Sequence, residues 1–135
     1  MVESSLLFEE APYLKLTVSG RKTRLKRTVQ LWFAYEEGKI YFLAHKGSQW
    51  WRNLSASPKS EVDVLEVAFQ GLGRLVPDKM NHIYDLFRKK YGADQVERWY
   101  GGGRSQRQAV EIEVGRVIGK RPETPRAVEP VISIS

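Results

Sequence analysis

The chain has 135 residues, the size of one domain, and its 41% hydrophobic and 28% charged residues make a globular composition. Because it has no cysteine and only two histidines, disulfide frameworks, thiolate zinc sites and cysteine nucleophiles are excluded, and we expect no metal site. No apolar run reaches the ~20 residues that cross a bilayer, and the acidic amino-terminal segment lacks a signal-peptide pattern, so we expect a cytoplasmic protein without a membrane partner.

Hydrophobic periodicity predicts strands along most of the chain. The six expected strands cover residues 13–19, 28–35, 40–45, 62–65, 67–76 and about 109–118. The turn signal Glu36-Glu37-Gly38-Lys39 joins the second strand to the third, so this pair is expected to form a hairpin.

Three helices are expected between the strands. Ser48 is a candidate N-cap for a short helix that ends before Pro58, and Asp94 is one for a short helix that ends at Tyr100. Between them, residues 77–91 show the apolar face and the basic last turn of an amphipathic helix.

This order of elements predicts an α+β fold. Strands at close spacing with helices inserted late indicate a six-stranded antiparallel β-barrel with peripheral helices, formed by residues 1–120 as one domain. Residues 121–135 contain three prolines and are expected to form an extended tail.

The net charge of +6 favours a polyanionic partner, namely nucleic acid, acidic lipid or a phosphorylated small molecule, and the first candidate site is basic. Between the first two strands stand Arg21, Lys22, Thr23, Arg24, Lys26, Arg27 and Thr28. Arginine holds a phosphate with two parallel donors, lysine supplies a point charge, and threonine adds a hydroxyl donor. The alternative is a solvated basic loop that keeps a sheet edge soluble.

The second candidate site follows the third strand. His45 ends that strand, and the residues after it are Lys46, Gly47, Ser48, Gln49, Trp50, Trp51, Arg52 and Asn53. Backbone N–H groups at a helix start favour anions. Neighbouring helical residues point ~100° apart, so the two tryptophans do not both face one core, and one is expected to face a cleft, a partner subunit or a flat aromatic ligand. The alternative is that both are packing residues.

The two candidate sites together carry a family resemblance. The stretch GRKTRLKRTVQLWFAYEEGKIYFLAHKGSQWWRNLSASP resembles the split-β-barrel flavin and deazaflavin oxidoreductases, which are relatives of the pyridoxamine 5'-phosphate oxidases. Within that group it is most similar to the nitroreductase or deazaflavin-dependent quinone reductase branch, and the likeness covers roughly residues 13–64. The resemblance implies a split barrel, often a homodimer, that binds FMN or the deazaflavin coenzyme F-420.

The resemblance also implies roles for particular residues. Lys22 and Arg27 match positions that bind the cofactor phosphate; Lys46, Gly47 and Ser48 match the turn against the phosphate or ring edge; and Trp50, Trp51, Arg52 and Asn53 match the helix that closes the site. Arg24 stands where many relatives have glycine, and the loop before the tryptophans is shorter than usual, which leaves FMN and deazaflavin both open.

The reaction implied is hydride transfer to or from a small quinone- or nitro-type substrate, with the cofactor supplying the chemistry and no catalytic side chain assigned. Tyr84, Tyr91 and Tyr100 are candidates for lining the substrate pocket. Packing is the favoured alternative for Tyr84 and Tyr91, because both lie on the apolar face of a predicted helix.

Two other functions remain open. A small barrel with a basic loop and exposed aromatic residues suits a single-strand nucleic-acid binder, although the strands lack a regular row of aromatic side chains for base stacking. A non-catalytic flavin-binding protein would use the same pocket without turnover.

Overall fold

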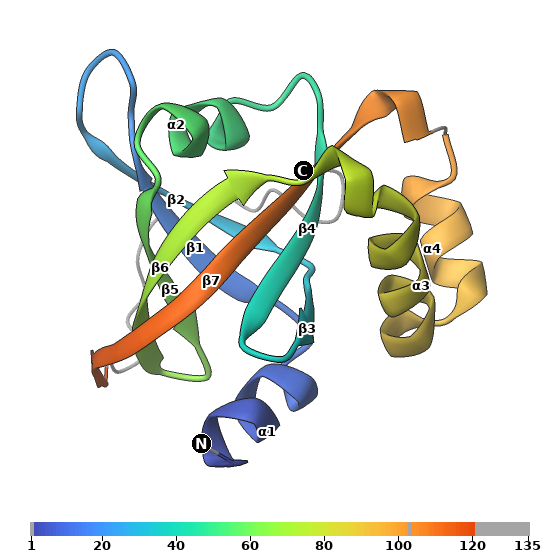
Figure 1. Cartoon of the computed structure of the whole chain (residues 1–135), viewed down its shortest axis with the longest axis horizontal. Coiled ribbons are helices and arrows are strands. Elements are labelled where there is room, and N and C mark those ends of the chain that lie inside the picture. The colour runs from blue at the N-terminus through green and yellow to red at the C-terminus, as the bar shows by residue number, and fades with distance from the viewer. Residues whose placement is uncertain (1, 103, 121–135) are drawn as a thin grey trace.

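The computed structural model describes residues 2–102 and 104–120, and its framework is a seven-stranded antiparallel sheet. The strands are β1 (Leu14–Ser19), β2 (Lys26–Leu31), β3 (Ala34–Glu36), β4 (Lys39–His45), β5 (Lys59–Val64), β6 (Val67–Leu75) and β7 (Arg107–Lys120). Their order in the sheet is β2-β1-β5-β6-β7-β4-β3, and the sheet curls into a half-barrel (Figure 1). The α+β antiparallel barrel with peripheral helices is confirmed, and the predicted number of six strands is wrong by one.

The additional strand arises because the predicted strand 28–35 is broken. Trp32 and Phe33 separate β2 from β3, and these two consecutive strands lie at opposite ends of the sheet. The hydroxyl group of Tyr91 lies 3.1 Å from both the nitrogen and the carbonyl oxygen of Phe33. The Tyr91 hydroxyl group therefore hydrogen-bonds to the backbone of Phe33, as a neighbouring strand would, at the point where the chain crosses from one sheet edge to the other.

Two turns have backbone conformations that most side chains avoid. Glu37 and Gly38 have φ values of 50° and 83°, which form the predicted tight hairpin between β3 and β4. Leu65 and Glu66, with φ values of 46° and 72°, form the same kind of connection between β5 and β6. Neither Leu65 nor Glu66 is a residue that usually forms turns. β5 begins at Lys59, whereas the sequence predicted its start at Val62.

In the described part of the chain, four α-helices pack against the ends and one side of the sheet (Figure 1): α1 (Val2–Glu10), α2 (Trp50–Ala56), α3 (Met80–Tyr91) and α4 (Ala93–Tyr100). Short 3-10 turns, η1 (Pro77–Lys79) and η2 (Arg104–Gln106), precede α3 and β7. In Figure 1, α2 lies across one end of the half-barrel and α1 across the other, while α3 and α4 flank β3 and β4. Within residues 2–102 and 104–120, none of the helices has the length and hydropathy of a membrane span.

Three details of the helices differ from the prediction. The sequence did not predict α1, and the N-cap position of α2 is Gln49 rather than Ser48, whose hydroxyl instead donates to the carbonyl oxygen of His45 at 2.5 Å. Gly92, with φ of 93°, occupies the N-cap position of α4 that was assigned to Asp94. The expected tail at residues 121–135 lies outside the described residues.

Two hydrophobic clusters lie on opposite faces of the sheet. The inner cluster fills the half-barrel, and its largest side chains are Phe8, Phe33, Phe42, Phe69 and Trp50. The outer cluster joins α3 and α4 to the other face of β3, β4 and β7 through Tyr41, Leu43, Ile83, Tyr84, Phe87 and Tyr100. The outward face of β1, β5 and β6 has no such cover among the described residues (Figure 1).

Candidate functional site

The basic loop between β1 and β2 is fixed to α2 by one arginine. The backbone N–H and Nη1 of Arg21 donate to the same side-chain oxygen of Asn53, at 3.1 and 2.8 Å, and its Nη2 donates to Gln49 Oε1 at 2.7 Å. Asn53 is only 4% exposed, so its amide is a fixed acceptor. Arg21 therefore positions the rest of the loop relative to the helix.

A cavity of about 280 Å³ lies between this loop and α2. It is lined by Gly20, Arg21, Lys22, Thr23, Arg27, Gln49 and Asn53. Three of these residues carry a positive charge, one carries a hydroxyl group, and none is acidic. Such a set of donors suits an anion of the size of a phosphate group.

Gly20 keeps this cavity open. A Cβ atom at this position would lie 2.9 Å from Thr23 Oγ1 and 3.5 Å from Arg27 Nε. Two backbone hydrogen bonds close the turn, from Gly20 N to the Leu25 carbonyl oxygen at 2.8 Å and from Arg24 N to the Gly20 carbonyl oxygen at 2.9 Å. A larger residue would therefore push aside the Thr23 side chain, which lines the cavity, and crowd the Leu25 carbonyl oxygen at 3.3 Å.

The loop between β4 and α2 lies beside the basic loop, and Gln49 is its one residue that lines the cavity. The carbonyl oxygen of Lys46 accepts from Trp51 Nε1 at 3.2 Å and from Arg52 Nη2 at 3.0 Å, and Gly47 N donates to His45 Nδ1 at 3.0 Å. The guanidinium of Arg52 also lies 4.7 Å from the ring centroid of Trp51. These contacts turn Trp51 and Arg52 toward their own loop.

The structure separates the two neighbouring tryptophans. Trp50 is 4% exposed and packs edge-on against Phe42 at 5.3 Å, and its Nε1 has no hydrogen-bond partner among the described residues. Trp51 is half-buried at the edge of the inner cluster. Trp50 is thus the packing residue of the pair, and Trp51 is the one available to a ligand.

The other predicted site residues lie apart from the cavity. Thr28 pairs with Thr17 on β1, with 2.8 Å between their hydroxyl oxygens, and does not line the cavity. Tyr84 and Tyr100 are buried in the outer cluster, where the Tyr84 hydroxyl donates to the Tyr100 carbonyl oxygen at 2.8 Å. The Tyr91 hydroxyl donates to the Pro12 carbonyl oxygen at 2.6 Å.

Burial raises the pKa of Tyr91 and Tyr100 well above the usual range, so both stay protonated. The structure thus gives Tyr84, Tyr91 and Tyr100 packing contacts, and none of them lines the 280 Å³ cavity or the groove described next. Their role in a substrate pocket stays a prediction that these contacts do not support.

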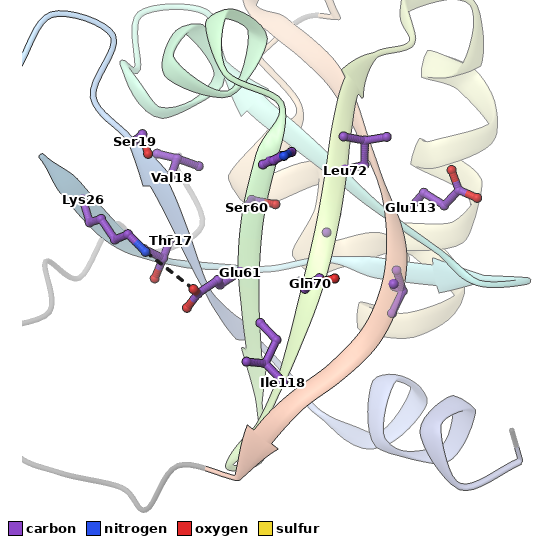
Figure 2. Close-up of a pocket in the computed structure, with 14 residues that line it drawn as sticks. Thr17, Val18, Ser19, Lys26, Ser60, Glu61, Gln70, Leu72, Glu113 and Ile118 are labelled. Atoms are coloured by element: carbon purple, nitrogen blue, oxygen red, sulfur yellow. Dashed lines mark ion pairs between the residues drawn. The ribbon is translucent and has the colours of Figure 1, made fainter. Parts of the chain in front are cut away.

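A second and larger hollow, of about 610 Å³, lies on the sheet surface formed by β1, β5, β6 and β7 (Figure 2). We refer to it as the outer groove. It is lined by Thr17, Val18, Ser19, Lys26, Lys59, Ser60, Glu61, Gln70, Gly71, Leu72, Glu113, Val114, Gly115 and Ile118. Of these residues, the sequence analysis named only Lys26, as part of the basic stretch. Polar residues at outward positions of a strand are expected on any solvent-exposed sheet face, so the others gave no signal.

Comparison with known proteins gives the family. The sequence model of the F420H(2)-dependent quinone reductases matches residues 2–106. The chain belongs to this family. Its members are oxidoreductases that use the deazaflavin F420, which confirms the resemblance seen in the sequence and supports F420 as the cofactor, while FMN stays compatible with the structural relatives of the pyridoxamine 5'-phosphate oxidase type.

Solved structures confirm the split-barrel fold. A FAD-binding protein from Mesorhizobium loti is 19% identical with a TM-score of 0.70, and the match covers 90% of this chain and 94% of that one. An F420 reductase is 20% identical with a TM-score of 0.65, and the match covers 84% of this chain and 94% of that one. A protein from Listeria innocua provisionally assigned as a pyridoxamine 5'-phosphate oxidase is 12% identical with a TM-score of 0.68, covering 86% and 94%.

Proposed function

We propose that this chain transfers hydride between F420 and a small organic acceptor of the quinone or nitro type. The observation that carries the proposal is the 280 Å³ cavity, where Lys22, Thr23 and Arg27 converge beside α2 inside the segment that matches the family. A phosphate group of the cofactor fits this lining, which carries three positive charges and no acidic residue. The homodimer and the cytoplasmic location expected from the sequence stay predictions that accompany this proposal.

Each part of the site has a separate task. Lys22 and Arg27 bind the phosphate through charge-assisted hydrogen bonds, and Arg21 holds the loop in register with α2 through Asn53. Trp51, which is half-buried, and the β4–α2 loop, which is fixed by hydrogen bonds to the Lys46 carbonyl oxygen, would hold the ring of the cofactor when it is bound. The bound deazaflavin supplies the hydride, so the protein needs to bind, orient and exclude water rather than to provide an acid or base.

The binding test removes the two cations that line the cavity. Lys22→Ala with Arg27→Ala removes two charge-assisted contacts, each of about 1.5–3 kcal/mol. We expect F420 affinity, measured by tryptophan fluorescence or calorimetry, to fall by roughly two to four orders of magnitude, with little change in melting temperature. Lys26→Ala is the matched control, because Lys26 pairs with Glu61 in the outer groove at 3.6 Å and lies outside the cavity. Equal F420 affinity in the wild type and the double variant would sink the assignment.

A second pair of variants separates the enzyme from a nucleic-acid binder. Trp51→Ala should weaken F420 binding and leave a single-stranded oligonucleotide at its weak, salt-sensitive background. In a single-strand binder, the same change would cost about 1–3 kcal/mol of oligonucleotide affinity through lost base stacking. Trp50→Ala should instead lower the stability by about 3–5 kcal/mol, because this ring is buried.

Turnover distinguishes an oxidoreductase from a protein that only holds the cofactor. Oxidation of reduced F420 in the presence of a quinone or a nitroaromatic compound is followed by absorbance, with FMN as the comparison cofactor. Tight F420 binding without any oxidation across several acceptors would support the non-catalytic alternative.

A further inference from the structure

Arg107, the first residue of β7, is a buried cation that the proposed function does not use. Its side chain is only 7% exposed, and none of the ion pairs among the described residues includes it. Burial lowers the pKa of Arg107, although its guanidinium group stays protonated. Burying a charge without a counter-ion costs folding free energy, so the hydrogen bonds of this group are the place to look for its role.

The guanidinium group of Arg107 joins three elements. Its Nη1 donates to the Leu43 carbonyl oxygen of β4 at 3.2 Å, and its Nη2 donates to the Trp99 carbonyl oxygen in the last turn of α4 at 2.9 Å. The last carbonyl groups of a helix have no partner within the helix and favour a cation. The guanidinium carbon also lies 4.5 Å from the ring centroid of Tyr100. Arg107 therefore fixes the end of α4 against β4 and β7.

The same junction holds the β4–α2 loop. His45, the last residue of β4, is in register with Arg107. The N–H of Lys46 donates to the Gln106 carbonyl oxygen at 3.0 Å, and the Lys46 carbonyl oxygen accepts from Trp51 Nε1 at 3.2 Å. In Figure 1, the β4–α2 loop and the start of β7 lie at the same end of the sheet. A shift at the start of β7 is therefore passed through Lys46 to Trp51.

We infer that Arg107 is a positioning residue of the cofactor site, because it fixes the start of β7 and thereby the β4–α2 loop. The inference rests on the proposed function in one respect, namely that this loop holds the ring of F420. Arg107 itself contacts neither cofactor nor acceptor, and it does not line the 280 Å³ cavity. Its loss should therefore disturb the ring side of the site and leave the phosphate side intact. A purely structural role, confined to α4, would disturb neither.

The first experiment follows the loop without any cofactor. Arg107→Met keeps the length of the side chain and removes its donors. Amide hydrogen exchange at Lys46 should become about 10-fold faster or more, because the loop opens locally more often. The indole N–H signal of Trp51 should shift in NMR spectra, since its hydrogen bond goes to the same residue. The amide of Gly20, bonded within the β1–β2 loop to the Leu25 carbonyl oxygen, should keep its rate, which excludes a global loss of stability.

Two further variants control this experiment. Arg98→Met is the matched control, because Arg98 is an exposed cation in the same last turn of α4, and it should leave Lys46 and Trp51 unchanged. Arg107→Lys keeps the charge but lacks the two parallel donors of the guanidinium group. It should fold even if the methionine variant does not, and its Lys46 exchange should be intermediate. Circular dichroism confirms the fold of each variant.

The second experiment measures binding by calorimetry and NMR. F420 affinity should fall about 10-fold in Arg107→Met and recover in part in Arg107→Lys, as expected when a supporting residue outside the site is lost. The affinity for inorganic phosphate, which probes the cavity alone, should be the same in the wild type and in both variants. A fall in both affinities would show that Arg107 supports the whole fold rather than the loop, and would overturn the inference.

The remaining outcomes are separate for the inference and for the proposed function. Unchanged Lys46 exchange in a folded Arg107→Met or Arg107→Lys variant would overturn the inference, and so would an equal change in Arg98→Met. Equal F420 affinity in the wild type and Arg107→Met, despite a loosened loop, would overturn it as well. A wild type that does not bind F420 at all would contradict the proposed function, whereas the exchange rates would still show whether Arg107 positions the loop.

Discussion

Arg24 holds a backbone conformation that residues with side chains rarely adopt. Its φ of 65° lies in the left-handed region, where a Cβ atom crowds the following carbonyl group. Many relatives that the sequence resembles have glycine at this position, so the structure explains their glycine and identifies the arginine as strained. The strain falls on the loop that forms the cavity, one residue after Thr23.

Replacing this residue tests the strain directly. Arg24→Gly should raise the free energy of unfolding by about 0.5–1 kcal/mol, as relief of the left-handed conformation exceeds the added chain entropy of glycine. Arg24→Ala is the control, because alanine keeps the strain and should bring no such gain. Thermal or denaturant unfolding measures both. A glycine variant that is no more stable than the alanine variant would show that the turn holds Arg24 without strain.

At the cavity, the charges could be predicted but their partners could not. Arg21, Lys22, Thr23 and Arg27 were predicted from a dense run of basic residues, and the structure brings all four to one place. Gln49 was not predicted as a lining residue, because a neutral amide in a helix start carries no signal in composition. Gly20 was missed as well, since the need for an absent Cβ depends on which side chains approach it.

At the scale of elements, α1 is held in place by the end of α3. Pro12 has no N–H to offer the carbonyl oxygen of Phe8 four residues earlier, and Lys90 Nζ lies 3.4 Å from that oxygen. The same amine lies 3.4 Å from the ring centroid of Phe33. Lys90 thus takes the place of a missing backbone donor, and burial lowers its pKa to about 8.

This contact predicts a pH dependence. The folded protein releases the Lys90 proton near pH 8, whereas the unfolded chain keeps it up to its ordinary pKa of 10.5, so raising the pH between these values stabilises the folded state. Relative to Lys90→Met, which does not titrate, the wild type should gain about 1–2 kcal/mol over this range after allowance for partial solvent exposure. The arginine of Lys90→Arg stays charged over this pH range. The wild type should therefore gain the same stability relative to Lys90→Arg as it gains relative to Lys90→Met. If the free energies of unfolding of the wild type and Lys90→Met differed by the same amount at pH 8 and at pH 10, the lowered pKa of Lys90 would be contradicted.

The elements that could be predicted are those with a regular period. The strands β1, β4 and β6 and the helix α3 were placed within a few residues, because alternation or helical spacing is clear in each. In α1, the apolar residues Leu6, Leu7 and Phe8 are adjacent in sequence and show no helical period, so the helix was missed. The break between β2 and β3 depends on Tyr91, 58 residues away, and no local pattern reports it.

At the scale of the whole molecule, both hydrophobic clusters share the same strands. In β4, Ile40 and Phe42 belong to the inner cluster, while Tyr41 and Leu43 belong to the outer one. Alternate residues of a strand face opposite sides of the sheet, so neither cluster can lose β4 without exposing the other. The two clusters are therefore expected to unfold together.

Two core substitutions test this coupling. Phe42→Ala in the inner cluster and Phe87→Ala in the outer cluster should each lower the stability by about 3–5 kcal/mol. We expect each variant to reduce protection from amide hydrogen exchange equally in β1 and in α3, since one cooperative unit opens. A Phe87→Ala variant that loses protection in α3 while β1 keeps its wild-type value would reveal two independent units.

The place of β7 in the sheet bears on how the protein is made. β7 is the last strand of the described residues, yet it lies between β6 and β4 and is in register with both. The strands that precede it form two sets, β2-β1-β5-β6 and β4-β3, with no ladder between them. Because a ribosome delivers the amino-terminal residues first, the nascent polypeptide holds both sets before the strand that joins them has been synthesised. Until residues 107–120 have been synthesised, the edges of β6 and β4 that β7 joins therefore stay unpaired, and an unpaired strand edge is a template for pairing with another chain.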